Sequence, residues 1–352
     1  GQAAMSANTT GANNVAVGSL TLDANTTATG NTAVGQAAMS ANTTGANNVG
    51  IGLSALYLNT TGASNVAVGA YTLDDNTTAD NNTAVGYAAL AANTTGDQNV
   101  AVGATSSDAN TTGRNNTSIG YASLGANTEG DSNTALGMNA LYANTTADNN
   151  TAVGTSALQS NTTASGNDAF GYLALSTNTT GSENVAIGSY TMDDNTTGAG
   201  NVAVGREALA NNTTASENVG IGKLSLYTNT TGAGNVAVGY TALRLNTTAS
   251  NNTAVGRQAM YANTTGGDNV AVGTYALDAN TTASQNTALG YAALSASTTG
   301  TGLTGVGSNA LDANTTGSYS TAVGYNALGA NTTGANNTAL GWAALYTNID
   351  GA

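Results

Sequence analysis

One feature constrains this chain more than any other: a glycine recurs at every seventeenth residue from Gly18 to Gly341, twenty times in succession, with no insertion or deletion. A clean copy of the repeat is NTAVGYAALAANTTGDQ at Asn82–Gln98. Repeats of fixed period fold into stacked units that contact only their neighbours. The period therefore predicts one continuous array over residues 1–352, without caps, rather than two or three globular domains.

Composition indicates that this array has a thin core. Hydrophobic residues make up 40% of the chain, but most are Ala and Val, with one Phe and one Trp. The 46 glycines and the absence of proline suit regular tight corners that keep their backbone donors. We expect room inside each coil for little more than one leucine and two valines. Such a coil is marginal alone, so we expect self-association, either as three chains side by side or as a stacked filament.

Charge and residue usage exclude several classes of function. The net charge is −14 and five residues are basic, too few for a nucleic-acid track. No apolar run approaches the roughly 20 residues of a membrane span. The chain has neither His nor Cys, which rules out a histidine triad, a thiol nucleophile and a zinc site. An active site built from carboxylates alone stays open, but the acids are spread over variable positions rather than converging, so we expect no enzyme, no cofactor and no metal site.

Counting from the glycine as position 0, positions 13 to 16 predict one short strand per coil. They follow the pattern Asn, Val or Thr, Ala, and then Val, Ile or Leu, for example at Asn82–Val85. Alternation of β-branched residues around a small one favours a strand, with positions 14 and 16 on one face and the alanine on the other. Stacked copies predict an all-β fold, a parallel β-solenoid (β-roll or β-helix) of about 20 coils of 17 residues.

The segment after the glycine carries a second apolar signal. Position 1 varies freely, as a solvent-facing position does, whereas position 3 is always small. Position 4 is Leu or Met in every copy but Ser107, which predicts a buried rib of one leucine per coil. Periodicity does not separate a second strand from a single helical turn here, and we favour the strand.

Asn-Thr-Thr at positions 7 to 9 predicts a corner, since Asn and the following Gly or Ala tolerate turn conformations. A second Asn at position 13 opens the next strand and is replaced only by Leu303 and Ser320. Identical amides stacked along the axis can hydrogen-bond to one another and satisfy buried corner groups. We expect such a ladder for at least the second Asn.

The corner motif is also an acceptor sequence for N-glycosylation, and its threonines are acceptors for O-glycans. Asp23, Asp74, Asp108, Asp193, Asp278 and Asp312 each stand two residues before such an Asn, as in the extended acidic form of the motif. The alternative is that Asn-Thr-Thr is only corner chemistry. The eighteen candidates are Asn8, Asn25, Asn42, Asn59, Asn76, Asn93, Asn110, Asn144, Asn161, Asn178, Asn195, Asn212, Asn229, Asn246, Asn263, Asn280, Asn314 and Asn331.

Three other site hypotheses are weaker. The pairs Asp74/Asp75 and Asp193/Asp194 carry calcium-type ligands, but calcium takes six to eight oxygens, so solvated corner acids are the better interpretation. Ice binding needs threonines two apart on a flat strand, whereas Thr-Thr at a corner points its hydroxyls apart. A receptor-binding adhesin would use the tyrosine-rich slots Tyr57, Tyr142, Tyr227, Tyr261 and Tyr346, which are scattered along the array.

The recurring Asn-x-Ala-Val-Gly of Asn82–Gly86, with Tyr87 and Leu90, and of Asn337–Gly341, with Leu345, resembles known surface fibres. It is similar to head repeats of trimeric autotransporter adhesins and to repeats of phage tail-fibre and related surface-fibre proteins. The resemblance implies a parallel β-roll, often trimeric, used as an extracellular stalk or adhesive surface on a cell or virion. We therefore expect a structural extracellular fibre with glycans on its corners; the alternatives are an adhesin or receptor-binding fibre and, less favoured, an ice-binding solenoid.

Overall fold

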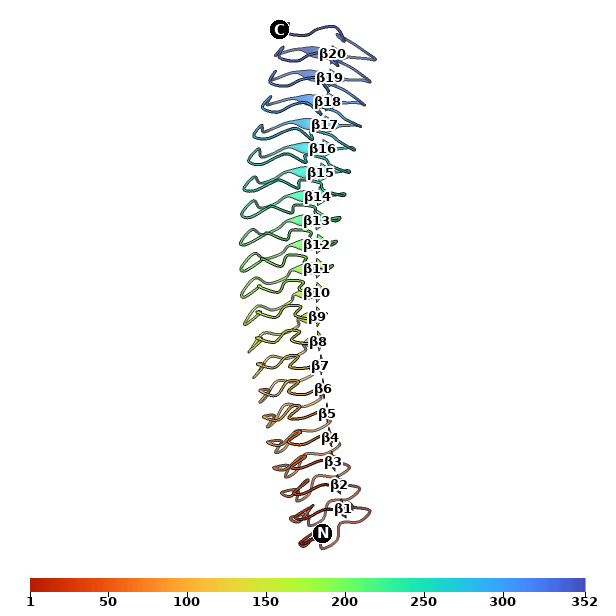
Figure 1. The fold of residues 1–352 in the computed structure, drawn as a ribbon, viewed down its shortest axis with the longest axis vertical. Coiled ribbons are helices and arrows are strands. Elements are labelled where there is room, and N and C mark those ends of the chain that lie inside the picture. Colours follow the sequence, from red (N-terminus) through yellow and green to blue (C-terminus); the bar gives the residue numbers. More distant parts are fainter. Residues whose placement is uncertain (352) are drawn as a thin grey trace. The chain divides into compact units, whose positions relative to one another are not determined.

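A computed structural model describes residues 1–351 and divides the chain into two compact units, Gly1–Thr180 and Gly181–Ala352. Within each unit the coils lie one above another, and each coil contributes one three-residue strand (Figure 1). The strands of the first unit are β1 (Val15–Val17), β2 (Thr32–Val34), β3 (Val49–Ile51), β4 (Val66–Val68), β5 (Thr83–Val85), β6 (Val100–Val102), β7 (Thr117–Ile119), β8 (Thr134–Leu136), β9 (Thr151–Val153) and β10 (Asp168–Phe170).

The second unit repeats this arrangement with ten more strands, and residues 1–351 contain no helix. They are β11 (Val185–Ile187), β12 (Val202–Val204), β13 (Val219–Ile221), β14 (Val236–Val238), β15 (Thr253–Val255), β16 (Val270–Val272), β17 (Thr287–Leu289), β18 (Thr304–Val306), β19 (Thr321–Val323) and β20 (Thr338–Leu340).

Consecutive strands within a unit pair in parallel, and each residue lies beside the one seventeen positions later. Val49 pairs with Val66 in the first unit, and Val202 pairs with Val219 in the second. Backbone hydrogen bonds continue the same register outside the strands; the Leu56 nitrogen, for instance, donates to the Thr72 oxygen at 3.0 Å. The predicted β-solenoid of parallel seventeen-residue coils is confirmed.

The glycine at position 0 is invariant for a steric reason. Its backbone has φ near +140°, as at Gly35 and Gly52, a region that side chains rarely adopt. A Cβ on Gly35 would lie only 2.3 Å from the Gly52 oxygen in the next coil. Any other residue here would strain its own backbone and push adjacent coils apart.

The orientation of the strands reverses one expectation, because the alanine, and not the β-branched pair, faces the core. Ala84 and Ala203 at position 15 have 0% exposure, while their neighbours at positions 14 and 16 are half-buried or exposed. The interior therefore does not hold two valines per coil. It is narrower than expected, and it is filled by the strand alanine, the small residue at position 3 and the leucine at position 4.

The leucine rib is confirmed, but the second strand that we expected around it is wrong. Position 4 is fully buried at Leu56, Leu90 and Leu226. Positions 3 and 4 both point inward, as Ala55 and Leu56 do, whereas adjacent strand residues would face opposite sides. The backbone achieves this by entering the left-handed region at positions 2 and 4, with φ of 54° at Ser54 and 55° at Leu56. The segment is a run of turns and neither a strand nor a helical turn.

The corner also differs in one detail from the sequence prediction. The asparagine at position 7 and the glycine at position 10 do not have positive φ; the left-handed residue comes at position 12, for example Asn47 with φ of 59°. The asparagine at position 7 is therefore explained by the hydrogen bonds of its side chain and not by its backbone conformation.

Candidate functional site

The Asn-Thr-Thr corner places its asparagine side chain inside the coil. The Asn42 Nδ2 donates to the Asn25 Oδ1 of the preceding coil at 3.2 Å and to the Gly45 oxygen of its own coil at 3.0 Å. The same pair of bonds recurs at Asn93 in the first unit and at Asn246 in the second. Position 7 is therefore an amide ladder along the axis that also closes each corner.

The second asparagine forms a different ladder, which confirms the structural role predicted for it. Its Oδ1 accepts from the backbone nitrogen of the next asparagine, as between Asn31 and Asn48 at 2.8 Å. Its Nδ2 reaches the position-10 oxygen of the following coil, as from Asn48 to Gly62 at 2.8 Å. Two buried asparagines per coil thus satisfy groups that the thin core leaves without backbone partners.

All eighteen N-glycosylation candidates belong to the first ladder. Asn8 is half-buried, and the other seventeen, from Asn25 to Asn331, have at most 1% exposure. A sugar on Nδ2 would have to replace a buried hydrogen bond and separate stacked coils. At the seventeen buried positions the folded chain leaves no room for an N-linked glycan on this nitrogen.

The two threonines of the corner are not equivalent. At position 8 the hydroxyl is half-buried and donates to the backbone oxygen of the next threonine, as from Thr43 to Thr60 at 3.0 Å. At position 9 the threonine is exposed in every coil that carries one, for example Thr44 and Thr231. The corner therefore presents one row of outward hydroxyls along one edge of each unit.

The acidic residues of the extended motif stand at position 5 and are half-buried. Burial raises the pKa of Asp108 and of Asp278 above the ordinary value of 3.8. For Asp193, burial and the neighbouring charges of Asp194 and Glu207 raise the pKa to about 6. These shifts reflect a carboxylate lying against the coil, and no group of three or more His, Cys, Asp or Glu side chains within residues 1–351 could hold a metal ion.

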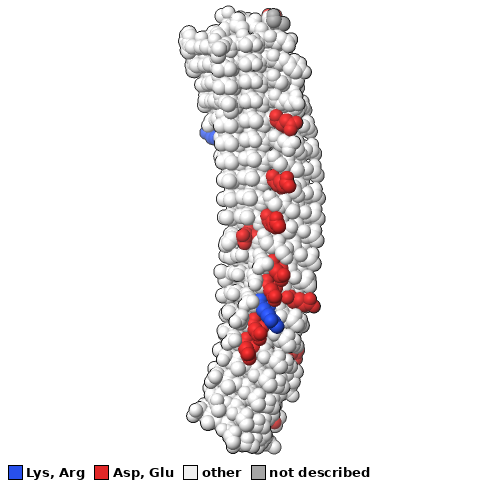
Figure 2. Space-filling view, turned by 180° about the vertical axis from the view of Figure 1, so that it is seen from behind, with Lys and Arg blue, Asp and Glu red and all other residues white. Residues whose placement is uncertain are grey.

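Charged side chains are few on the face shown in Figure 2, and most of that face is uncharged. In the first unit, position 11 carries four acids and one arginine in successive coils. Their carboxylates accept backbone N–H groups of the preceding coil, as the Asp97 Oδ1 does from the Asp80 nitrogen at 2.8 Å. The column consists of Asp80, Asp97, Arg114, Asp131 and Asp148.

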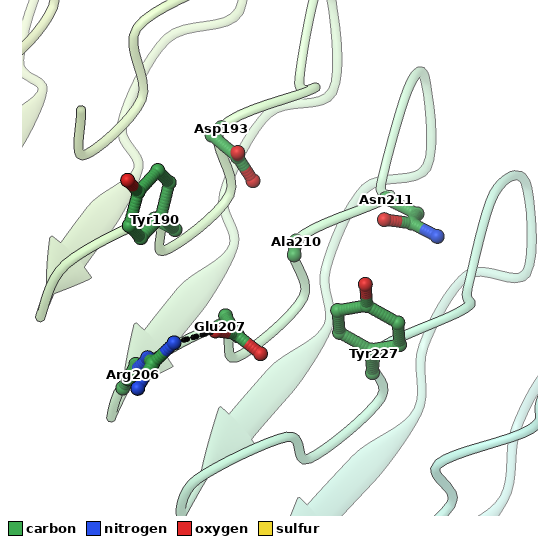
Figure 3. A pocket seen from close by; sticks show the side chains of 7 residues that line it. All are labelled: Tyr190, Asp193, Arg206, Glu207, Ala210, Asn211 and Tyr227. Carbon is green, nitrogen blue, oxygen red and sulfur yellow. Dashed lines mark ion pairs between the residues drawn. The ribbon is translucent and has the colours of Figure 1, made fainter.

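A shallow hollow of about 290 Å³ opens beside position 5 in the second unit (Figure 3). Tyr190 and Tyr227 stand on either side of Glu207 and Ala210 (Figure 3), and the Arg206 Nη2 lies 2.7 Å from the Glu207 Oε1. The arrangement offers aromatic faces and two carboxylates, those of Asp193 and Glu207, which can contact a polar ligand.

A second hollow, of about 330 Å³, lies in the first unit and has a similar origin. Position 5 reads Asp108, Gly125 and Tyr142 in successive coils there, as it reads Asp193, Ala210 and Tyr227 in the second unit. In both stretches the middle residue at position 5 is small, and the Asp before it and the Tyr after it line the hollow. The second is lined by Thr105, Asp108, Tyr121, Ala122, Asn139, Tyr142 and Gln159.

The tyrosines predicted for an adhesive surface all lie in this column at position 5. Tyr57, Tyr142 and Tyr346 have exposed fractions of 39 to 48%. Tyr227 and Tyr261 are half-buried and flank Arg244, whose guanidinium lies 5.8 Å from each ring centroid. The column is not a single patch, because other residue types separate its tyrosines.

Sequence reasoning missed the outward face of the strands. Positions 14 and 16 form two parallel rows of Val, Thr, Ile and Leu along each unit, with exposed fractions near 40% at Ile51 and Ile187. A signal was present, since Thr fills position 14 in half of the strands and Asp168 fills it in β10. No strand has threonine at both positions, so the paired threonine rows of an ice-binding face do not occur.

Comparison with known proteins gives no further guide. The chain matches no known protein family, and no curated protein matches it either. None of the segments in residues 1–351 forms a helix long and apolar enough to cross a bilayer.

Proposed function

We propose that this chain is a non-enzymatic structural fibre or stalk, displayed outside a cell or on a virion. The observation that carries the proposal is that, within each unit, nearly every coil is joined to the next by the same set of bonds. These are the backbone register, two asparagine ladders and a threonine ladder, as at Asn42, Asn48 and Thr43. Stability then comes from repeated nearest-neighbour interfaces, which suits an element that spans distance.

The fibre proposal is tested with whole-coil insertions. One or several copies of Asn82–Gln98 would be inserted after Gln98, and the particles measured by electron microscopy. We expect the contour length to grow by about 4.8 Å per inserted coil, the spacing of paired strands, with no loss of folding. A sixteen-residue insertion is the matched control and should break the register. Equal tolerance of both insertions, or particles whose length ignores coil number, would refute the proposal.

We also propose that the fibre carries its sugars on the position-9 threonines. Three observations support this site: the Asn nitrogens are buried, the position-8 hydroxyls are bonded to the next coil, and the position-9 hydroxyls are exposed. A glycan sheath would keep a chain with 7% charged residues in solution. Intact mass before and after chemical deglycosylation decides the point. A mass equal to the bare 34.1 kDa would rule the sheath out, and sugars mapped to Asn would refute the threonine assignment.

A second candidate function, an adhesin, is favoured by the two hollows at position 5. Tyrosine rings beside a carboxylate can stack on a sugar ring and accept its hydroxyl hydrogens. Binding of the native chain to an array of oligosaccharides tests this, with Tyr227→Ala and Tyr142→Ala as the informative variants. Binding that neither substitution weakens would exclude the hollows as the site.

A further inference from the structure

Within the second unit, the first four strands differ from most of the later ones in the side chains that they turn outward. These four strands, β11 to β14, carry only valine and isoleucine at positions 14 and 16. Ile187 and Ile221 are exposed by 41% and 39%. No strand of this unit has a charged residue at either position. A continuous, partly exposed aliphatic strip of this kind marks an interaction surface. It consists of Val185, Ile187, Val202, Val204, Val219, Ile221, Val236 and Val238.

Charged residues flank this strip in an ordered way. Two residues before a strand, at position 12, stand the acids Glu183, Glu217 and Asp268, and all three are exposed. Two residues after a strand, at position 1, stand the bases Arg206, Lys223 and Arg257, which are exposed too. Neither position carries the opposite sign in this unit, and in the first unit both positions are uncharged. The strip therefore has one acidic edge and one basic edge.

We propose that a second copy of this chain packs on this strip, parallel and in register, about a two-fold axis along the solenoid axis. Such a rotation exchanges the two edges, so the acidic edge of each copy faces the basic edge of the other. An antiparallel pair would instead place acid against acid and base against base. Charge complementarity thus selects both the partner and its direction.

The heights of the charges fit this arrangement. Glu217 and Lys223 flank the same strand, β13, so in an in-register pair they stand at one level. Glu183 precedes β11 while Arg206 follows β12, and Asp268 precedes β16 while Arg257 follows β15. Each of these two pairs is one coil apart, about 4.8 Å along the axis. Long side chains span that offset.

Existing contacts of two of the bases do not prevent such pairing. Arg206 bonds to Glu207 at 2.7 Å, but its side chain is 61% exposed. Arg257 lies 5.7 Å from the ring centroid of Tyr275, which leaves its donors free to turn outward. Exposed ion pairs contribute little to stability, so exchange of partners has a small cost.

The repeat itself explains why the partner is another copy. Side chains on the strip recur at one strand spacing, and a second copy has the same spacing, so the two rows interdigitate along the whole unit. A surface without this period would lose register after a few coils. The strip itself, four strands about 4.8 Å apart and roughly 10 Å wide, gives about 400 Å² over both copies, and the whole face of ten strands gives about 1,000 Å², below the standard size of a specific interface. We expect a weak, concentration-dependent dimer.

The inference rests on the proposed fibre function and names its lateral contact. The first test is sedimentation of wild type and of Val202→Asp with Val236→Asp, over a range of concentrations. We expect a dimer for wild type and a monomer for the variant, with the dissociation constant raised at least tenfold. Position 14 already holds Asp168 in β10, so the fold accepts this change. Thr214→Asp with Thr231→Asp, in exposed corners of the same unit, is the matched control and should stay dimeric.

Direction is tested through thiols, because the described chain has no cysteine. Facing sheets lie about 10 Å apart, within reach of a short bis-maleimide. In the parallel pair position 14 faces position 16, so Val219→Cys mixed with Ile221→Cys should crosslink, and neither variant should crosslink alone. Crosslinking of each variant with itself would overturn the parallel arrangement.

The remaining outcomes also decide the proposal. A wild type that stays monomeric, a trimer, or a dimer that survives the valine substitutions would overturn it. Ice shaping by monomeric wild type, lost in the variant, would assign the strip to ice instead. A monomeric chain that still lengthens with inserted coils would keep the fibre function and reject only this interface.

Discussion

Two irregular regions, one in each unit, replace consensus side chains with shorter polar ones, and they do so with opposite results. In the first unit Ser107 takes the place of the core leucine, and Ser118 replaces the strand alanine. The Ser107 Oγ donates to the Ser118 Oγ at 2.8 Å, and the Ser106 Oγ does so at 2.7 Å. The hydroxyls are buried and satisfy one another.

In the second unit Ser297 replaces a ladder asparagine, and nothing compensates. Its buried Oγ has no hydrogen-bond partner, and neither does the Oδ1 of Asn280, the rung before it. Asn314, the rung after it, donates to its own corner at Gly317. A hydroxyl is too short to span the distance between coils that an amide bridges.

The difference shows that the core and the ladder tolerate change for different reasons. Core positions lie close to several neighbours, so short polar groups can gather and pair there. A ladder position has one neighbour above and one below, one coil away, and only a side chain of the right reach connects them. Substitutions near these two regions test this contrast.

The largest effect is expected for Leu90→Asp, in the coil before Ser107. Leu90 is fully buried, and a carboxylate there exceeds what a hydroxyl cluster can solvate, so we expect a local loss of about 4 kcal/mol or more. Hydrogen exchange of the amides in residues 82–107 measures it. Tyr87→Asp is the control, because Tyr87 is 58% exposed and should tolerate the change. Equal loss in both variants would contradict the assignment of inner and outer faces.

The next effect compares two rungs of the same ladder. Asn246 donates twice and accepts from Asn263, so Asn246→Ala should cost about 3 kcal/mol at roughly 1 kcal/mol per bond. Asn280 donates twice but accepts nothing, so Asn280→Ala should cost about 2 kcal/mol. Coil-resolved hydrogen exchange should show this order. An equal cost would mean that the break at Ser297 is harmless.

A smaller gain is expected from Ser297→Asn, which restores the missing rung. The new amide would donate to the Asn280 Oδ1 and accept from Asn314, which should stabilise the surrounding coils by about 1 to 2 kcal/mol. Slower exchange of amides in residues 280–314 would show it. Ser295→Asn, at the half-buried position 5 of the same coil, is the control and should change little. A Ser297→Asn variant no more stable than wild type would show that the unpaired groups carry no cost.

The smallest effects concern the serine cluster. Ser118→Ala removes the acceptor of two hydroxyls and should destabilise by about 1 kcal/mol. Adding Ser107→Leu restores the consensus core and should more than reverse this loss, because apolar burial replaces the network. Chemical denaturation, monitored by hydrogen exchange, measures the free energy of unfolding of both variants. Strictly additive effects would show that the hydroxyls do not act as a unit.

The repetition made much of the fold predictable. A glycine at constant spacing fixed the coil length, and β-branched residues at two constant positions located the strand. What could not be predicted was which side of the strand faces inward, because bulk alone favours burying Val over Ala. The width of the interior decides that question, and Asp168 at position 14 was the clue that the bulky side faces out.

The candidate site was predictable in position but not in orientation. The composition of Asn-Thr-Thr indicates a corner. The same three residues, however, are compatible with an exposed glycosylation acceptor and with a buried ladder of hydrogen-bonded amides. Only the stacking at 17-residue spacing, which brings Asn42 against Asn25, distinguishes them. Leucines with left-handed backbone conformations, such as Leu56, could not be predicted either. Leucine disfavours this conformation locally, and packing against neighbouring coils stabilises it.

The constant register has a genetic consequence. Each coil recognises its neighbour by a bonding pattern that nearly every other coil shares, so the fold is indifferent to how many coils there are. Segments 1–15 and 35–49 are identical in amino-acid sequence, and repeats of this kind favour unequal recombination of a gene. Duplication or loss of whole repeats changes the length of the protein and leaves its fold intact. Length is then a trait that selection can adjust in single-repeat steps, without passing through misfolded intermediates.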